Sequence, residues 1–157
     1  MAPEVGAAAP DFTLPNQDRA PVTLSEQLKK GPVVLVFFPA AFSGTCTKEM
    51  CTFRDALADL DRMSATVLGV STDTFFALKA WADARHLTFP LLSDFNKTVI
   101  RQYGVVNPDM IGLKDIAKRA TFVIGRDGTI RYSEILGDAR NEPDYDAVRI
   151  AISRLSA

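Results

Sequence analysis

The sequence predicts an α/β fold in which a mostly parallel central sheet is covered by helices on both faces. Apolar runs of strand length alternate along the chain with stretches whose apolar residues recur at helical spacing. This alternation is typical of parallel strands joined by helical crossovers. Near the C-terminus, two strand-like runs flank a turn containing Asp127-Gly128, so an antiparallel hairpin should extend one edge of the sheet.

The composition is that of one soluble globular domain. The length of 157 residues suits a single domain spanning residues 1–157 and is short for two. The formal net charge is −1, which gives no indication of a nucleic-acid or membrane-surface partner. No apolar segment approaches the ~20 residues that a membrane-spanning helix needs.

Cysteine usage and the N-terminal segment both indicate a cytoplasmic protein. Two cysteines are too few for the several disulfide bonds that stabilise a small secreted domain. The opening MAPEVGAAAPDF has no basic stretch and is interrupted by prolines, unlike a secretory signal peptide. We therefore expect cytoplasmic localisation.

The first 30 residues predict a loose lead-in, two edge strands and a short helix. Residues 11–14 and 21–24 are short alternating runs joined by a turn-rich segment, whereas residues 1–9 show no pattern. Ser25 is expected to cap a brief helical turn that ends in two lysines, where positive charge is favoured.

Residues 33–55 form the centre of the predicted fold. The run VVLVFF at 33–38 has no polar alternation, which indicates a strand buried on both faces. Pro39 ends that strand, and a loop of small residues leads into a helix. The apolar face of this helix is expected to comprise Met50, Phe53, Leu57 and Leu60.

The middle of the chain predicts further strands and helices. We expect a buried strand at 66–71, a helix at 74–86, a short strand at 89–92 and a helix at 95–103 that Gly104 stops. Residues 105–118 have no clean period and contain proline and glycine, so they are predicted to be loop.

The final third predicts the hairpin and a closing helix. The hairpin strands are expected at 121–124 and 129–135. Pro143 suits the first turn of the closing helix. Its inward face is expected to comprise Tyr145, Val148, Ile152 and Leu155.

Both cysteines lie where the central strand gives way to its helix. If Ser43 is the N-cap, Cys46 occupies the third helical position, where unpaired N–H groups and the helix dipole favour a thiolate. Such positions lower a cysteine pKa from ~8.5 into the range of ~3.5 to 7.5, and the thiolate is the nucleophile. Alternatively, Cys46 is a small buried hydrophobe, as most free cysteines are.

The spacing between Cys46 and Cys51 restricts disulfide formation. Five residues along a helix correspond to a rise of ~7.5 Å and a rotation of ~140°, which puts the Cα atoms about 8.6 Å apart. A disulfide needs them within ~7 Å, so its formation requires the first helical turns to unwind. The two cysteines and one distant histidine, His86, also fall short of the ligand set of a zinc site.

The segment around Cys46 resembles the active-site motif of peroxiredoxins. Pro39-Ala-Ala-Phe-Ser43-Gly-Thr-Cys46 matches the PxxxTxxC or PxxxSxxC signature, with serine at the hydroxyl position. The segments APDFTLPNQD, STDTFFALKAWA, PLLSDFNKTVIRQYGV and RATFVIGRDGTIRYSEI are similar to that family as well. The chain is most similar to the one-cysteine alkyl hydroperoxide reductase E-like group, but a cysteine five residues further on resembles the bacterioferritin-comigratory (Q-type) group.

The resemblance implies a thioredoxin-like fold and a peroxidase that reduces hydrogen peroxide and organic hydroperoxides without metal or other cofactor. Cys46 would attack the peroxide and become a sulfenic acid. The Ser43 hydroxyl would hydrogen-bond the thiolate and the peroxide, and Pro39 would shield the site from water. Arg119 would hold the thiolate and position the substrate.

The resemblance also implies supporting roles for neighbouring residues. The N–H groups of Thr45 and Cys46 would polarise the O–O bond. Glu49 would orient the arginine, and Phe42 would form an apolar collar for organic peroxides. Cys51 would resolve the sulfenic acid as an intrachain disulfide.

Thioredoxin, a comparable dithiol or a low-molecular-weight thiol would then reduce the disulfide. The resemblance is compatible with a monomer or a homodimer.

Other interpretations of these residues stay open. Cys51 could only pack, giving a one-cysteine peroxidase, or the oxidation could be relayed to a partner by a peroxide sensor. A binding module with an inert Cys46 is a third alternative. Each of the other residues also has a purely structural interpretation. Pro39 could only end the strand, and Ser43 could only cap the helix. Arg119 and Glu49 could be charged residues on the surface.

Overall fold

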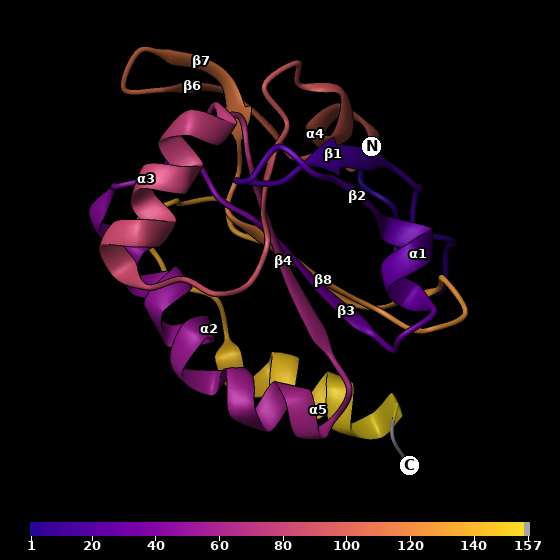
Figure 1. The fold of residues 1–157 in the computed structure, drawn as a ribbon. Coiled ribbons are helices and arrows are strands. Elements are labelled where there is room, and N and C mark those ends of the chain that lie inside the picture. The colour runs from indigo at the N-terminus through magenta and orange to yellow at the C-terminus, as the bar shows by residue number, and fades with distance from the viewer. Residues whose placement is uncertain (156–157) are drawn as a thin grey trace.

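The computed structural model describes residues 1–155 and has a five-stranded central sheet in the order β5-β4-β3-β8-β9 (Figure 1). These strands are β3 (Val33–Phe37), β4 (Thr66–Ser71), β5 (Leu91–Ser93), β8 (Ala120–Ile124) and β9 (Ile130–Ile135). The pairs β3–β4 and β4–β5 are parallel, whereas β3–β8 and β8–β9 are antiparallel. The predicted α/β class and the C-terminal hairpin are therefore confirmed, and the sheet is mixed.

Strand β3 lies at the centre of the sheet because every one of its side chains is buried. Val33, Leu35 and Phe37 face one core cluster, and the alternate residues Val34 and Val36 face the other. This explains the absence of polar alternation in the sequence, since a strand covered on both faces has no solvent-facing positions.

Helices cover both faces of the sheet (Figure 1). Helices α2 (Gly44–Arg62), α3 (Phe75–Arg85) and α5 (Tyr145–Leu155) contribute to the cluster that contains Val34 and Val36. The opposite cluster is built with α1 (Leu24–Leu28) and α4 (Thr98–Gln102).

The N-terminal elements agree with the predicted strands but correct two details. Strands β1 (Thr13–Pro15) and β2 (Pro21–Thr23) pair antiparallel in a sheet of their own. The lead-in is held in place rather than loose, since Ala8 forms a bridge with Thr129 beside the β8–β9 turn. Ser25 does not cap α1: Thr23 is the N-cap, and the Ser25 N–H donates to Asp11 Oδ1 at 2.9 Å.

The loop prediction for residues 105–118 is wrong. This segment is a hairpin of β6 (Val106–Met110) and β7 (Leu113–Ala117), visible at the top of Figure 1. Ile111 and Gly112 join the strands with φ of 48° and 91°, as in the turns of two-residue hairpins. Most of its side chains are exposed or half-buried, so the alternation of a half-buried strand is absent from the sequence.

Two helix boundaries differ from the predictions for physical reasons. Helix α4 begins at Thr98 because the Asp94 carboxylate accepts the N–H groups of Thr98, Val99 and Ile100. Helix α5 begins at Tyr145, so Pro143 precedes its first turn. Asp144 Oδ1 instead accepts the N–H of Ala147 at 3.0 Å, a bond typical of a helix cap.

Candidate active site

Cys46 lies in the first turn of α2, as the sequence predicts. Ser43 is the N-cap, so Gly44 and Thr45 precede Cys46 in the helix. The first hydrogen bond of the helix runs from the Thr47 N–H to the Ser43 carbonyl. The N–H groups of the three residues before Thr47 therefore point out of the helix start, where they favour a negative charge.

The Ser43 side chain does not cap the helix, which leaves those N–H groups available. Its hydroxyl donates to the Ala40 carbonyl at 2.9 Å, and α2 has no side-chain cap hydrogen bond. The hydroxyl expected to touch the thiolate thus contacts backbone here. Thr45 Oγ1 lies 3.5 Å from the Arg140 carbonyl, across the mouth of the site.

Asp73, which the sequence analysis did not identify, holds the loop that precedes Cys46. It follows β4 and accepts the Ala41 N–H at 2.8 Å and the Ser71 hydroxyl at 2.7 Å through the same carboxylate oxygen. The parallel pairing of β3 and β4 brings the ends of these strands together. This contact also steadies a strained turn, because Phe42 has a φ of 67°.

Arg119 contacts Cys46 although the two residues are 73 positions apart in the sequence. Because Ala120 of β8 pairs with Phe37 of β3, the start of β8 lies beside the loop at the end of β3. Arg119 is only 2% exposed, and its Nη2 donates to Cys46 Sγ at 3.3 Å. A guanidinium at this distance stabilises a sulfur anion.

Two further groups fix the Arg119 guanidinium. Nη1 donates to Glu49 Oε1 at 2.7 Å. Nε and Nη2 both donate to the Ala139 carbonyl, at 3.1 and 2.8 Å. The resemblance implies that Glu49 orients the arginine, whereas the contact with Ala139 is not predictable, because a backbone acceptor has no signature in a sequence.

Burial dominates the electrostatics of the Glu49–Arg119 pair. Removal from solvent raises the pKa of Glu49 from its ordinary 4.5 to about 8, although the Arg119 charge opposes the rise. Burial lowers the pKa of Arg119, but the charges of Glu49 and Cys46 outweigh it and hold that pKa above its ordinary value. One oxygen of Glu49, Oε2, has no hydrogen-bond partner among the described residues.

A cavity of about 620 Å³ leads to this cluster. Its lining includes Pro39, Ser43 and Thr45 from the segment before Cys46, and Met110 and Ile111 from the β6–β7 hairpin. Arg119 also lines it, whereas Cys46, which accepts a hydrogen bond from Arg119, does not. It is large enough for hydrogen peroxide or a small organic hydroperoxide.

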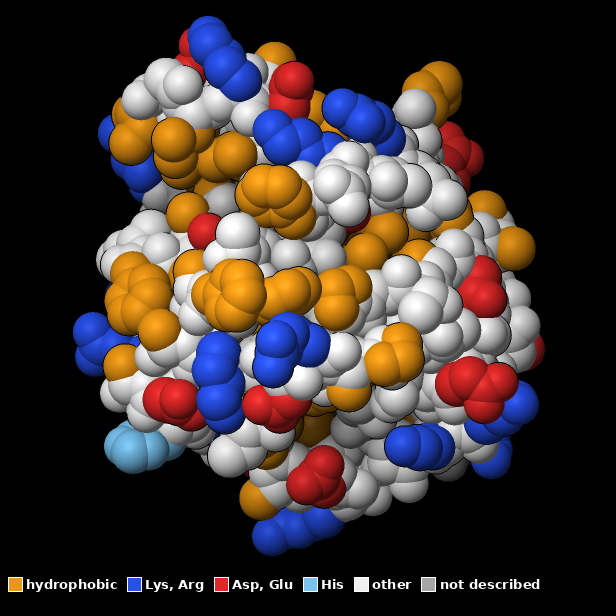
Figure 2. Space-filling model, turned by 45° about the horizontal axis from the view of Figure 1, so that its top comes forward, with side chains coloured by type: hydrophobic (Ala, Val, Ile, Leu, Met, Phe, Trp, Pro, Cys, Tyr) orange, Lys and Arg blue, Asp and Glu red, His pale blue; other side chains and the backbone are white. Residues whose placement is uncertain are grey.

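Phe42 does not line this cavity, contrary to its expected role as a collar. Its ring lies 6.2 Å from that of Trp81 and is 54% exposed. Figure 2 shows exposed hydrophobic side chains gathered on one face of the molecule. The exposed large hydrophobic residues include Phe42, Phe76, Phe95 and Ile111.

Cys51 lies on the same helix as Cys46 but apart from the cluster. Both cysteines are free, Cys46 fully buried and Cys51 half-buried. Helix α2 is continuous from Gly44 to Arg62, so the helical geometry that separates the two cysteines is present in the structure.

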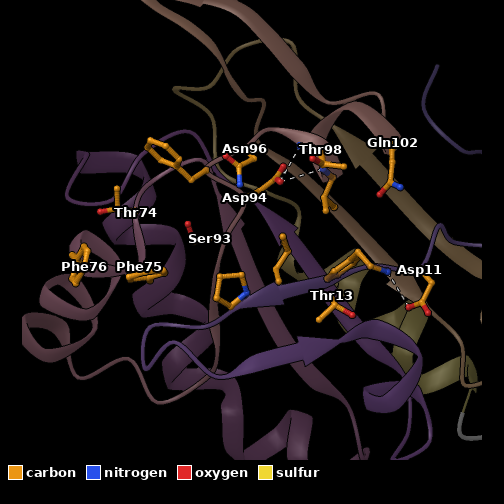
Figure 3. Close-up of a pocket in the computed structure, with 15 residues that line it drawn as sticks. Asp11, Thr13, Thr74, Phe75, Phe76, Ser93, Asp94, Asn96, Thr98 and Gln102 are labelled. Carbon is orange, nitrogen blue, oxygen red and sulfur yellow. Dashed lines mark hydrogen bonds between the residues drawn. The ribbon is translucent and has the colours of Figure 1, made fainter.

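A second cavity, of about 500 Å³, lies near β1 and the start of α3 (Figure 3). Its walls include Phe12, Phe75 and Phe76 but no cysteine and none of the predicted site residues. It is connected to Asp73 through Ser93, whose hydroxyl donates to the Asp73 carbonyl at 2.6 Å, and through Thr74, which follows Asp73 in the chain. The second cavity therefore contains none of the residues to which the resemblance assigns the chemistry.

Residues 1–155 contain neither a candidate metal-binding cluster nor a candidate membrane-spanning helix. No cluster of three or more His, Cys, Asp or Glu side chains could hold a metal ion there. In the same residues, every helix is too short or too polar to cross a membrane.

Comparison with known proteins identifies the family. A family model described as AhpC/TSA matches residues 5–133. Alkyl hydroperoxide reductase E of Mycobacterium bovis is 41% identical over 142 residues, covering 88% of this chain and 90% of that protein. The putative peroxiredoxin bcp of Coxiella burnetii is 40% identical over 132 residues, 83% of this chain and 87% of that protein.

Solved structures agree with these relatives. Peroxidoxin BcpB from Mycobacterium tuberculosis is similar with a TM-score of 0.84 and 37% identity, covering 97% of this chain and 96% of that one. A peroxiredoxin-like protein from Aquifex aeolicus is similar with a TM-score of 0.89 and 25% identity, covering 99% of this chain and 89% of that one. The resemblance stated from the motifs is thus confirmed: the chain belongs to the AhpC/TSA family, has the thioredoxin-like fold of peroxiredoxins and is a thiol-dependent peroxidase.

Proposed function

We propose that Cys46 is the peroxidatic cysteine of this enzyme and that Arg119 holds its thiolate. The observation that carries the proposal is the 3.3 Å contact between Arg119 Nη2 and Cys46 Sγ at the first turn of α2. The thiolate attacks one peroxide oxygen, the O–O bond breaks, and the products are a sulfenic acid on Cys46 and the alcohol or water.

The other site residues have positioning roles in this proposal. Arg119 lines the cavity and touches the sulfur, so it can hold the peroxide beside the thiolate. The N–H groups of Thr45 and Cys46 stabilise the charge that moves onto the departing oxygen. Pro39 and Ser43 line the same cavity, and a rotation of the Ser43 hydroxyl away from Ala40 would let it donate to the thiolate or the peroxide.

Cys51 is proposed to resolve the sulfenic acid. Its thiol displaces the sulfenic oxygen as water, and a disulfide between Cys46 and Cys51 forms. Because α2 is continuous through both residues, this step requires the helix to unwind around them. A dithiol such as thioredoxin, or a low-molecular-weight thiol, would then reduce the disulfide.

The decisive experiment treats the reduced protein with one equivalent of peroxide and follows thiol content and intact mass. Loss of both thiols, with a mass decrease equal to two hydrogens, supports the intrachain disulfide. A stable sulfenic acid, or overoxidation with Cys51 still free, would contradict the resolving role and leave a one-cysteine peroxidase. Cys46→Ser should abolish peroxide consumption, and unchanged consumption would overturn the assignment of Cys46.

The remaining expectations are also proposals. We propose that residues 1–157 form one domain, supported by the 97% of the chain that aligns with a single solved structure. Cytoplasmic localisation is supported by the two free cysteines and by bacterial relatives. One relative, from Triticum aestivum, is named as chloroplastic, so fractionation of the source cells is the test. Sedimentation of the reduced protein would distinguish monomer from homodimer.

A further inference from the structure

Three ionisable side chains meet in the site, and only one of them is a cation. Cys46, Glu49 and Arg119 are 0%, 0% and 2% exposed. Arg119 donates to both acids, at 3.3 Å to the sulfur and 2.7 Å to the carboxylate. One guanidinium can balance one anion, and a second buried negative charge would lack both solvent and a counter-ion.

The surroundings of Glu49 disfavour its ionised form. Oε2 is buried with no hydrogen-bond partner among residues 1–155, and an anionic oxygen left in this way costs more than a neutral one. The nearby acidic groups are Glu134 on β9 and Glu142 before α5, and both add negative potential. Glu142 is itself engaged, by Lys48 at 3.0 Å and by the Tyr145 hydroxyl at 2.8 Å. Arg119 is therefore the one cation that contacts Glu49 among the described ion pairs.

We propose that Glu49 carries a proton while Cys46 is a thiolate and releases it when the thiolate is consumed, so that the site keeps one negative charge opposite Arg119. This inference rests on the proposed role of Cys46. In the reaction, the sulfur lone pair forms the S–O bond, the O–O bond breaks, and the departing alkoxide or hydroxide takes up one proton. Thiolate, hydroperoxide and Glu49 carboxylic acid thus become sulfenic acid, alcohol and Glu49 carboxylate, with the total charge unchanged.

Glu49 acts as a positioning residue, because it does not line the cavity and is linked to the reacting sulfur only through Arg119. The departing oxygen therefore takes its proton from solvent in the cavity, Glu49 gives its own proton up to solvent, and the net balance is unchanged. Resolution by Cys51 releases water and no proton, so Glu49 stays ionised in the disulfide form. Reduction by a dithiol supplies two hydrogens. One becomes the Cys51 thiol proton, and the other returns to Glu49 as Cys46 becomes a thiolate again.

Infrared difference spectroscopy of the whole protein at neutral pH tests the proposal directly. On oxidation by one equivalent of hydrogen peroxide, the carbonyl stretch of a protonated carboxylic acid should disappear and carboxylate bands should appear. Glu49→Gln should lack this change. Glu142→Gln, which removes a nearby carboxylate outside the cluster, is the matched control and should retain it.

Proton uptake measured in the same reaction with a pH indicator provides a second readout. The unmodified protein should take up close to no proton per peroxide, whereas Glu49→Gln should take up one, since the proton that its departing hydroxide takes from solvent is not replaced by one from Glu49. Thiolate absorbance should fall on oxidation in both proteins. An unmodified protein that takes up one proton and shows no loss of the carboxylic band overturns the proposal.

The design separates this inference from the proposed function. Peptide mass mapping of the same samples reports whether Cys46 was oxidised; if it was not, the peroxidatic assignment fails. If Cys46 is oxidised and the carboxylic band persists, or if Glu49→Gln also loses it, only the role of Glu49 is overturned. Should the glutamine variant not fold, the unmodified protein alone decides, because its carboxylic band must be lost on oxidation.

Discussion

Replacing Arg119 by methionine removes the charge next to the Cys46 sulfur while keeping an apolar side chain of similar length. At the 3.3 Å separation of Nη2 and Sγ, the Coulomb attraction is about 5 kcal/mol for an effective dielectric constant of 20. Part of that energy offsets desolvation, and hydrogen bonds to charged groups contribute a net ~1.5 to 3 kcal/mol. We take about 2 to 3 kcal/mol as the loss of thiolate stabilisation.

A loss of this size corresponds to a factor of about 30 to 150 in an equilibrium constant. We therefore expect the rate of Cys46 oxidation to fall by about two orders of magnitude, and by more if Arg119 also holds the peroxide. Stopped-flow measurement with hydrogen peroxide gives the combined effect. Alkylation by iodoacetamide needs the thiolate but no peroxide-binding group, so its rate reports the loss of thiolate stabilisation alone.

The pH dependence separates charge from structure. At alkaline pH the thiol ionises without help, so the alkylation defect of Arg119→Met should shrink. Arg119→Lys is the matched control: it keeps the charge but loses the forked contacts to Glu49 and Ala139, and an intermediate rate is expected. Equal alkylation rates for Arg119→Met and the unmodified protein at neutral pH would refute the reasoning, as would a defect of constant size at every pH.

Three further predictions follow from the same geometry. Cys51→Ser should leave the first oxidation rate unchanged but prevent disulfide formation, and hydrogen exchange near residues 44–52 should then no longer increase on oxidation. Asp73→Ala removes the acceptor of the Ala41 N–H, so unfolding free energy should fall by about 1 to 3 kcal/mol and oxidation should slow; an unchanged melting temperature and rate would contradict this. Because the pKa of Glu49 rises from 4.5 to about 8 on folding, the native state binds more protons in that window, and the stability of the reduced protein should decrease from pH 5 to pH 8 by at most about 4 kcal/mol. Glu49→Gln should flatten this slope, and identical pH–stability curves for the two proteins would disprove the assignment.

Local sequence was sufficient to place Cys46, because a strand, a proline and a helix start within fourteen residues determine its position. The contact with Arg119 could not be derived in this way. It depends on the pairing of β8 with β3, which brings together residues 73 positions apart. Only the resemblance to peroxiredoxins identified Arg119 among the basic residues of the chain.

Other parts of the site left no signal in the sequence. Ala139 contributes only a carbonyl oxygen, and the loop that carries it is defined by the backbone bond from the Leu136 N–H to the Arg119 carbonyl. The β6–β7 hairpin was missed because its side chains are mostly exposed and Pro108 interrupts its ladder. Asp73 appears in the sequence as an ordinary turn residue, and its function as an acceptor depends on the adjacent ends of β3 and β4.

The geometry that would activate Cys46 is also the geometry that keeps Cys51 away from it. A thiolate at the first turn needs an intact helix, because the helix dipole and the free N–H groups exist only while the turn is formed. The disulfide needs that turn to open.

Opening the first turn of α2 would separate Glu49 from Arg119, whose 2.7 Å contact joins α2 to the start of β8. The first turn itself is weakly held, with an exposed Gly44 and no side-chain cap. The strength of the Glu49–Arg119 contact after oxidation should therefore set the rate of disulfide formation, and Glu49→Gln, which weakens it, should form the disulfide faster once Cys46 is oxidised. Stopped-flow detection of the second oxidation step, compared with a Glu134→Gln control on β9, would measure this. An unchanged or slower step would show that the Glu49–Arg119 contact does not hold the helix closed.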